Sequence, residues 1–111
     1  MSEQVRMIDV DTALDWIRKD EVVIVDVREA DEYAAVHIAG SHLLPLSEFD
    51  AARMPDVPAG KKLLLHCRSA NRCGMAAALL LQSGYSGEIN RLSGGILAWL
   101  QAGAPTVSET D

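Results

Sequence analysis

The sequence predicts a single α/β domain in which a central, mostly parallel sheet of about five strands has helices on both faces. Three observations lead to this prediction. The chain has 111 residues, a length that corresponds to one domain with a core of its own. Short β-branched or leucine-rich runs alternate with segments of helical periodicity, which is typical of strands joined by crossover helices. The strand runs are almost continuously apolar, as strands covered on both faces are.

The first half of the chain begins with a predicted helix capped by Asp9. Its apolar positions follow the 3.6-residue helical period: Val10, Ala13, Leu14 and Ile17. The elements expected next are a strand at 22–27, a short helix at 29–36 ending near Gly40, a brief strand at 42–44 before Pro45, and a short helix capped by Ser47 and Asp50 and closed by Pro55.

The second half of the chain contains the strongest helix signal. The elements expected there are a turn at 58–62, a buried strand at 62–66, a helix at 72–82 with Gly84 as its C′ residue, a strand at 88–92, and a helix at 96–102 stopped by Gly103 and Pro105. We expect the VSETD segment, 107–111, to be a loose tail. The side chains expected to pack in the core of these last helices are Met75, Leu79, Leu80, Ile96, Trp99 and Leu100.

Charge and composition exclude several classes of function. The formal net charge of −6 argues against a nucleic-acid partner. The N-terminus has neither the basic start nor the apolar stretch of a secretory signal, and the apolar runs are too short for a membrane helix. We therefore expect a soluble, cytoplasmic protein with no membrane partner. Its two cysteines are expected to be free thiols, and the spacing of His37 and His42 does not suggest a metal site.

Cys67 stands at the junction between the predicted strand 62–66 and the predicted helix 72–82. In open parallel sheets, functional sites form where the carboxyl ends of strands meet the amino ends of helices. The free N–H groups of such a loop and of the first helical turn point into one concavity and favour negative charge. We therefore expect the pKa of the Cys67 thiol to lie below its ordinary value of about 8.5, with Arg68 and Arg72 adding positive charge.

The expected outcome is a nucleophilic thiolate that faces a pocket for an anion, and two chemistries fit it: attack on phosphorus or attack on a polarisable sulfur. Four residues separate Cys67 from Arg72, whereas the phosphatase signature is His-Cys-x5-Arg. A shorter loop makes a smaller cradle, which suits a single sulfur atom better than a phosphoryl group. The loop length favours sulfur but does not decide the question alone.

Three separated segments, in the correct order, match those of one known family. VVIVDVREADEYAAVHIAGS resembles an Asp-Val-Arg strand end followed by a Glu-Tyr helix and a Gly-His-Ile-Pro-Gly-Ala segment. LHCRSANRCGMAAALLLQSGY resembles an active-site loop and helix, and INRLSGGILAWLQAGAP resembles a closing Gly-Gly-x-x-x-Trp segment with a Gly-x-Pro end. The chain resembles a single-domain rhodanese over roughly residues 5–105, so 1–111 is expected to form one rhodanese-like domain with a polar tail at 106–111.

This resemblance implies the rhodanese α/β fold and a thiosulfate sulfurtransferase in which Cys67 is the catalytic residue and carries a persulfide. Sulfane sulfur would pass from thiosulfate or a similar small anionic donor to cyanide or a thiol. The loop amides would hold the bound sulfur and Arg72 would help to hold the donor. No cofactor is implied. The substrate-binding residues would be Arg68, Ser69, Ala70, Asn71 and Arg72.

Three other functions remain open. The domain could be a sulfur carrier that delivers persulfide sulfur to a protein partner and turns over thiosulfate only weakly. It could be a non-enzymatic interaction module, although Cys67 and Arg72 argue against that reading. A phosphatase or arsenate reductase is the remaining alternative, and the short loop disfavours it.

The chain departs from the family pattern at several positions. Ala70 replaces a small residue that is often Gly, which restricts the backbone if that position needs a positive φ. Cys73 stands where the family usually has Ser; we interpret it as a small buried residue that exchanges little with Cys67. The remaining departures are Val36 and Ala39, in place of Gly and Pro, and they concern a structural turn.

The neighbours of Cys67 are interpreted as structural. His66 directly precedes Cys67 on an extended strand, so the two side chains should point to opposite faces, and His66 is a poor general base for this thiol. Asp26 and Arg28 close a strand at the same sheet edge and are expected to support its conformation. We expect Arg28 to pair with Glu32 in the next helical turn.

Overall fold

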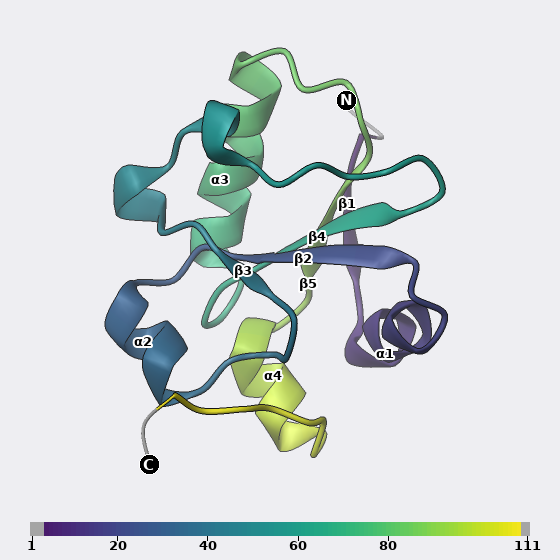
Figure 1. Cartoon of the computed structure of the whole chain (residues 1–111), viewed down its shortest axis with the longest axis vertical. Helices are drawn as coiled ribbons and strands as arrows, with labels where there is room; N and C mark the ends of the chain where they lie inside the picture. The colour runs from purple at the N-terminus through teal and green to yellow at the C-terminus, as the bar shows by residue number, and fades with distance from the viewer. Residues whose placement is uncertain (1–3, 110–111) are drawn as a thin grey trace.

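The computed structural model describes residues 4–109 and has a five-stranded sheet in the order β1-β5-β4-β2-β3. Every adjacent pair of strands is parallel, so the predicted α/β fold is confirmed and the sheet is parallel throughout. Figure 1 shows α3 on one face of the sheet and α1 and α4 on the other. Connections of this kind place the carboxyl ends of all five strands at one edge of the sheet.

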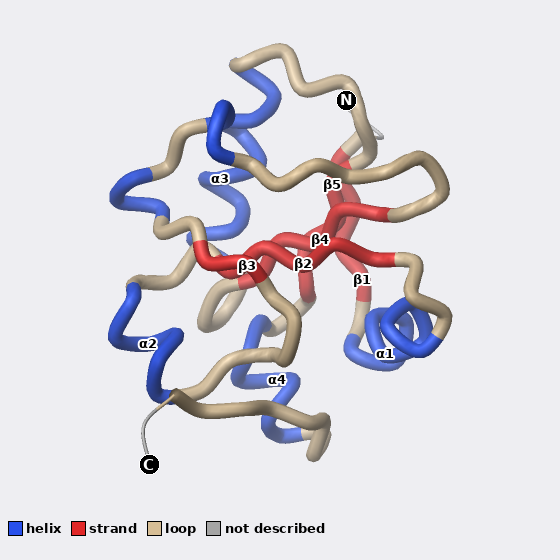
Figure 2. Tube along the Cα trace, viewed as in Figure 1, coloured by secondary structure: helices blue, strands red, loops and turns tan. Residues whose placement is uncertain are grey.

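The predicted strands are present, and so are the predicted helices apart from the one near Ser47 and Asp50, with small shifts at their ends (Figure 2). The longest is α3, with 12 residues, and no helix within residues 4–109 combines the length and apolar character needed to cross a bilayer. In chain order the elements are β1 (Val5–Ile8), α1 (Val10–Arg18), β2 (Val22–Asp26), α2 (Ala30–Ala35), β3 (His42–Leu43), β4 (Lys62–His66), α3 (Asn71–Gln82), β5 (Ile89–Leu92) and α4 (Gly95–Gln101).

Two local features differ from the prediction. The short helix expected near Ser47 and Asp50 consists of two separate 3₁₀ turns, Leu46–Glu48 and Ala51–Arg53. Asp50 does cap the second turn, accepting a hydrogen bond from the Ala52 N–H at 2.9 Å. The strand β1 was not predicted; it is an edge strand in which Ile8 alone is buried and which pairs only with β5.

The core lies in two layers, one on each face of the sheet. Between β4 and α3 the buried helix positions are Cys73, Ala76, Ala77 and Leu80, spaced as one stripe of a helix. Met75 and Leu79 lie beside that stripe and are 59% and 41% exposed, so the expectation that they pack in the core was wrong. On the other face Ile96 and Trp99 are buried as predicted, but Leu100 is 43% exposed because it follows Trp99 around the helix.

The segment after α4 is held in place, contrary to the expected loose tail. Val107 exchanges two backbone hydrogen bonds with His37, at 2.9 and 2.8 Å. The Glu109 N–H donates to the Ala34 carbonyl at 2.9 Å, and the Trp99 indole donates to the Pro105 carbonyl at 2.9 Å. These bonds order a polar segment whose composition alone suggested mobility. The rest of the predicted tail, 110–111, lies outside the described residues.

Candidate active site

Cys67 follows the last residue of β4 directly, at the carboxyl edge of the sheet, and α3 begins four residues later at Asn71. The chain therefore makes the predicted tight reversal between strand and helix. The side chain of Cys67 lies at the base of this loop and the residue is only 1% exposed. We refer to residues 67–72 as the cysteine loop.

Main-chain N–H groups point at the Cys67 sulfur, as expected for a loop that stabilises an anion. The Ala70 N–H donates to Sγ over 3.1 Å and the Cys73 N–H over 3.4 Å. The hydrogen bond from the Cys73 thiol is the largest cause that lowers the pKa of Cys67 to about 5. The N–H groups of Cys73, Ala70 and Ser69 act in the same direction, while burial opposes them. Cys67 is therefore a thiolate at neutral pH.

This pKa predicts where the Cys67 thiol ionises. In a pH titration, the ultraviolet absorbance of the thiolate should rise through a midpoint near pH 5 and be complete well below neutrality. The contribution of Cys67 is isolated by subtracting the titration of the Cys67→Ser variant. A free cysteine titrates near about pH 8.5. A midpoint in that range for Cys67 would contradict the inferred hydrogen bonding.

Ala70, which stands where the resembled family often has Gly, has a left-handed conformation with a φ of +99°. An L-residue with a Cβ atom pays about 1 to 2 kcal/mol in this region, and Gly does not. Its backbone N–H is nevertheless one of the groups that point at Sγ. The loop thus keeps the conformation that brings the N–H of Ala70 to Cys67, although an alanine is unfavourable in that conformation.

Cys73 is fully buried, as predicted, but it also takes part in the hydrogen bonding of the loop. Its Sγ lies 3.1 Å from the Ala70 carbonyl oxygen, and its single proton can be donated either to that oxygen or to the Cys67 sulfur. Its interaction with Cys67 and its burial raise its pKa well above the ordinary value, so it remains protonated when Cys67 is ionised. Cys73 is therefore suited to donate hydrogen bonds, whereas Cys67 is suited to accept them.

Arg72, at the start of α3, forms a two-pronged ion pair with Glu32 of α2. The two N···O distances are 2.7 and 2.8 Å. The guanidinium lowers the pKa of Glu32 to about 2. The expected pairing of Arg28 with Glu32 was wrong, because the Arg28 side chain turns to Asp26, two residues earlier, with its closest contact at 2.6 Å. Glu32 therefore belongs to the site through Arg72, and the partner predicted for it from the sequence, Arg28, was incorrect.

The other residues predicted to bind substrate lie on the outside of the loop. Arg68, Ser69 and Asn71 are exposed. The backbone of the loop is held from beneath by α4: the Ile96 N–H donates to the Cys67 carbonyl at 2.9 Å and the Leu97 N–H donates to the Arg68 carbonyl at 3.2 Å. The approach is so close that a Cβ atom at Gly95 would overlap both carbonyl oxygens. Gly95 is thus required by the site as well as by the turn.

His66, Asp26 and Arg28 form a buried cluster of ionisable side chains behind the cysteine loop. The Nε2 atom of His66 lies 3.5 Å from Oδ2 of Asp26, and burial lowers the pKa of the imidazole. As expected for adjacent residues on a strand, the ring points to Asp26 and not to the Cys67 thiol. These residues are placed to support the loop from the end of β2.

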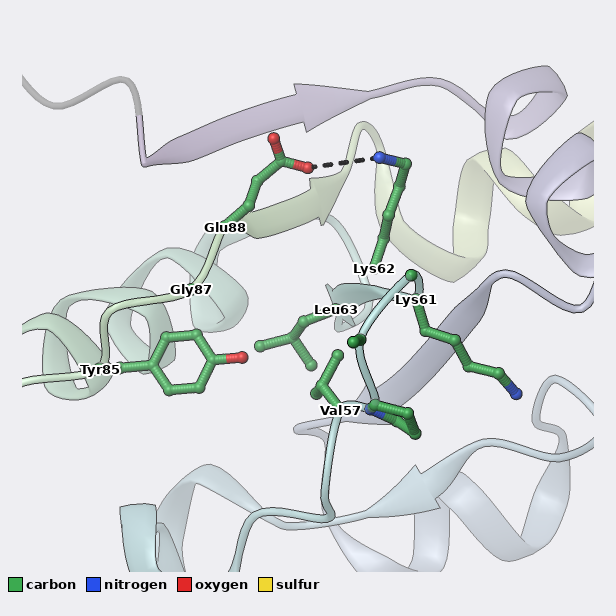
Figure 3. A pocket seen from close by; sticks show the side chains of 10 residues that line it. Val57, Lys61, Lys62, Leu63, Tyr85, Gly87 and Glu88 are labelled. Carbon is green, nitrogen blue, oxygen red and sulfur yellow. Dashed lines mark ion pairs between the residues drawn. The ribbon is translucent and has the colours of Figure 1, made fainter.

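The pocket drawn in Figure 3 contains none of the predicted site residues. It has a volume of about 440 Å³ and lies at the amino end of β4, where its walls include Val57, Lys61, Leu63 and Tyr85. Cys67 follows the opposite end of the same strand. Within residues 4–109 no group of His, Cys, Asp or Glu side chains is arranged to hold a metal ion.

Fold and site together define a class of protein: a small parallel α/β domain with an activated cysteine in a short loop between a strand and a helix. The model of the rhodanese-like domain family matches residues 9–102, and the chain belongs to this family. The resemblance found in the three sequence segments is thereby confirmed.

Several relatives have clear sequence identity with the chain. An uncharacterised protein of Synechocystis is 44% identical over a segment that covers 81% of this chain and 49% of that protein. A sulfurtransferase of Allochromatium vinosum is 36% identical over 80% of this chain and 81% of its own length. A thiosulfate sulfurtransferase of Pseudomonas fluorescens is 37% identical over 75% of this chain and 74% of its own.

Solved structures show the same fold. A rhodanese-related protein from Thermoplasma volcanium superimposes with a TM-score of 0.77 at 30% identity, over 92% of this chain and 97% of that one. A thiosulfate sulfurtransferase from Pseudomonas aeruginosa also reaches a TM-score of 0.77, at 27% identity. The superimposed region covers 95% of this chain and 20% of that one.

Proposed function

We propose that the protein is a sulfurtransferase that moves sulfane sulfur from thiosulfate, or a similar small anionic donor, to a thiophilic acceptor. The observation that carries the proposal is the cluster of N–H donors around the Cys67 sulfur. Two relatives that are 36% and 37% identical over the aligned segments are named sulfurtransferase and thiosulfate sulfurtransferase, which supports the same activity.

The proposed reaction has two steps, in which sulfur passes first to Cys67 and then to the acceptor. The Cys67 thiolate attacks the outer sulfur of thiosulfate; a new S–S bond forms, the S–S bond of thiosulfate breaks, and sulfite leaves with the electron pair. A thiophilic acceptor such as cyanide then attacks the outer sulfur of the persulfide, forms thiocyanate and releases the Cys67 thiolate. The negative charge stays in the cysteine loop throughout, where its N–H groups stabilise it.

A second candidate is delivery of the persulfide sulfur to a protein acceptor. It is favoured by a relative in which the matched segment is part of a longer chain. A probable adenylyltransferase/sulfurtransferase of Mycobacterium tuberculosis is 30% identical over 82% of this chain, which corresponds to 24% of that protein. The two candidates share the Cys67 persulfide and differ in the acceptor.

Mass spectrometry tests the proposed intermediate directly. The protein is incubated with thiosulfate, and the intact mass is expected to increase by one sulfur atom that peptide mapping places on Cys67. Cyanide should then remove it and yield thiocyanate. Slow removal by cyanide with rapid transfer to a protein thiol would favour the carrier function. Absence of the added sulfur, or its location on Cys73, would contradict both. Hydrolysis of an aryl phosphate would instead support the phosphatase alternative.

The role of Arg72 is tested by comparing two variants. If Arg72 helps to hold an anionic donor, Arg72→Ala should raise the donor KM about tenfold with a smaller effect on kcat. Glu32→Gln removes the charge that now holds the guanidinium and should lower the donor KM. If Arg72 serves only to join α2 to α3, both variants will lower thermal stability and leave the donor KM unchanged.

A further inference from the structure

Arg91 is a charged residue within the largely buried strand β5. Side chains alternate along a strand, so Arg91 shares the face of Ile89, which packs against α3. Within residues 4–109, no carboxylate lies within ion-pair distance of Arg91. Its guanidinium instead contacts the cysteine loop: Nη2 donates to the Ala70 carbonyl at 2.8 Å, and Nε lies 3.5 Å from Sγ of Cys73.

Gly74 makes the space that this contact needs. A Cβ atom at position 74 would lie 2.7 Å from Nη2 and 3.1 Å from Cζ of Arg91. The guanidinium thus passes α3 where the helix has no side chain. A methyl group at this position would displace the nitrogen that binds Ala70.

The Ala70 carbonyl accepts from the Arg91 guanidinium and from the Gly74 N–H at 3.4 Å, and the Cys73 Sγ lies 3.1 Å from it. The N–H of Ala70 donates to the Cys67 sulfur. The N–H and the carbonyl of Ala70 are joined through its Cα atom, where φ is +99°, an angle that is unfavourable for alanine. Fixing the carbonyl therefore keeps the N–H aimed at Sγ.

We propose that Arg91 is a positioning residue for Cys67: it holds Ala70 in the left-handed conformation in which the loop's N–H groups reach the reacting sulfur. The proposal rests on the proposed function only in that Cys67 is the residue that reacts. The ionisable groups that interact with Cys67 itself are His66, Arg72 and Cys73. Arg91 acts through Ala70 and Cys73, and does not need to touch a substrate.

The Cys67 thiolate titration tests this role without any sulfur donor, so failure of the proposed function would not affect it. Arg91→Met removes the donors and keeps most of the side-chain length. We expect it to raise the pKa of Cys67 by about one unit, the effect of weakening one hydrogen bond to an anion. Arg6→Met is the matched control, because Arg6 is an exposed arginine on the neighbouring strand β1 and pairs with Glu88. It should leave the Cys67 titration unchanged.

Two further variants separate positioning from a general structural role. Gly74→Ala keeps the charge of Arg91 but displaces its guanidinium, and it should raise the pKa of Cys67 without lowering the melting temperature, since Ala favours helix. Ala70→Gly removes the strain at position 70, so the shift caused by Arg91→Met should shrink in its presence. If Arg91→Met and Gly74→Ala both leave the Cys67 pKa unchanged, the proposal is wrong. Should Arg91→Met fail to fold, Gly74→Ala alone decides.

Discussion

Cys67→Ser is expected to reduce thiosulfate:cyanide turnover at least about a thousand-fold, because a serine hydroxyl cannot carry sulfane sulfur. The N–H groups that donate to Sγ can also donate to the smaller serine oxygen, so the variant should keep the fold. Turnover is measured as thiocyanate formation, and the fold is checked by circular dichroism and thermal unfolding. Turnover close to that of the wild type would remove Cys67 from the mechanism.

Cys73→Ser is the informative companion variant. A serine hydroxyl can donate to the Ala70 carbonyl as the Cys73 thiol can. We therefore expect it to retain persulfide formation on Cys67, with a raised Cys67 pKa if the hydroxyl donates less well to the thiolate. Loss of the added sulfur in Cys73→Ser, together with its retention in Cys67→Ser, would reverse the assigned roles of the two cysteines.

The site could be located from sequence because its main determinant is local. Cys67 follows a run of leucines and precedes a helical segment, and that order alone places it at the carboxyl edge of a parallel sheet. The conformation of Ala70 was indicated only conditionally, by the Gly that the resembled family often has at this position, and the structure gives Ala70 a φ of +99°. These features depend on residues within one strand-loop-helix segment.

The partners that come from distant segments could not be assigned in this way. Glu32 was matched to Arg28 by helical spacing, whereas its partner Arg72 lies 40 residues along the chain. Arg91 reaches Ala70 only because β5 returns beside β4. One sequence signal was available: a charge within an otherwise buried strand must find a polar partner. The edge strand β1 escaped prediction because its pairing with β5, and not its own composition, stabilises it.

Arg28→Met is expected to destabilise the protein by about 3 to 5 kcal/mol, because it leaves a buried carboxylate without its partner. Asp26 is fully buried and Arg28 is 3% exposed. Three contacts of 2.6 to 3.1 Å join the Arg28 side chain to the carboxylate, and the same guanidinium donates to the Val36 carbonyl at 2.7 Å. Such a loss is a large fraction of the stability of a domain of this size. The free energy of unfolding in urea measures it.

The matched control is Arg18→Met, since Arg18 is 74% exposed and lies 3.8 Å from Asp15 on the surface of α1. Its effect should be a small fraction of that of Arg28→Met, because water screens the exposed pair. The double variant Asp26→Asn/Arg28→Met removes both charges and should recover part of the stability that Arg28→Met loses. If the double variant is no more stable than Arg28→Met, or if Arg28→Met resembles Arg18→Met, then the pair does not anchor the end of β2. The cysteine loop would then depend on α4 and Arg91 for its support from the rest of the fold.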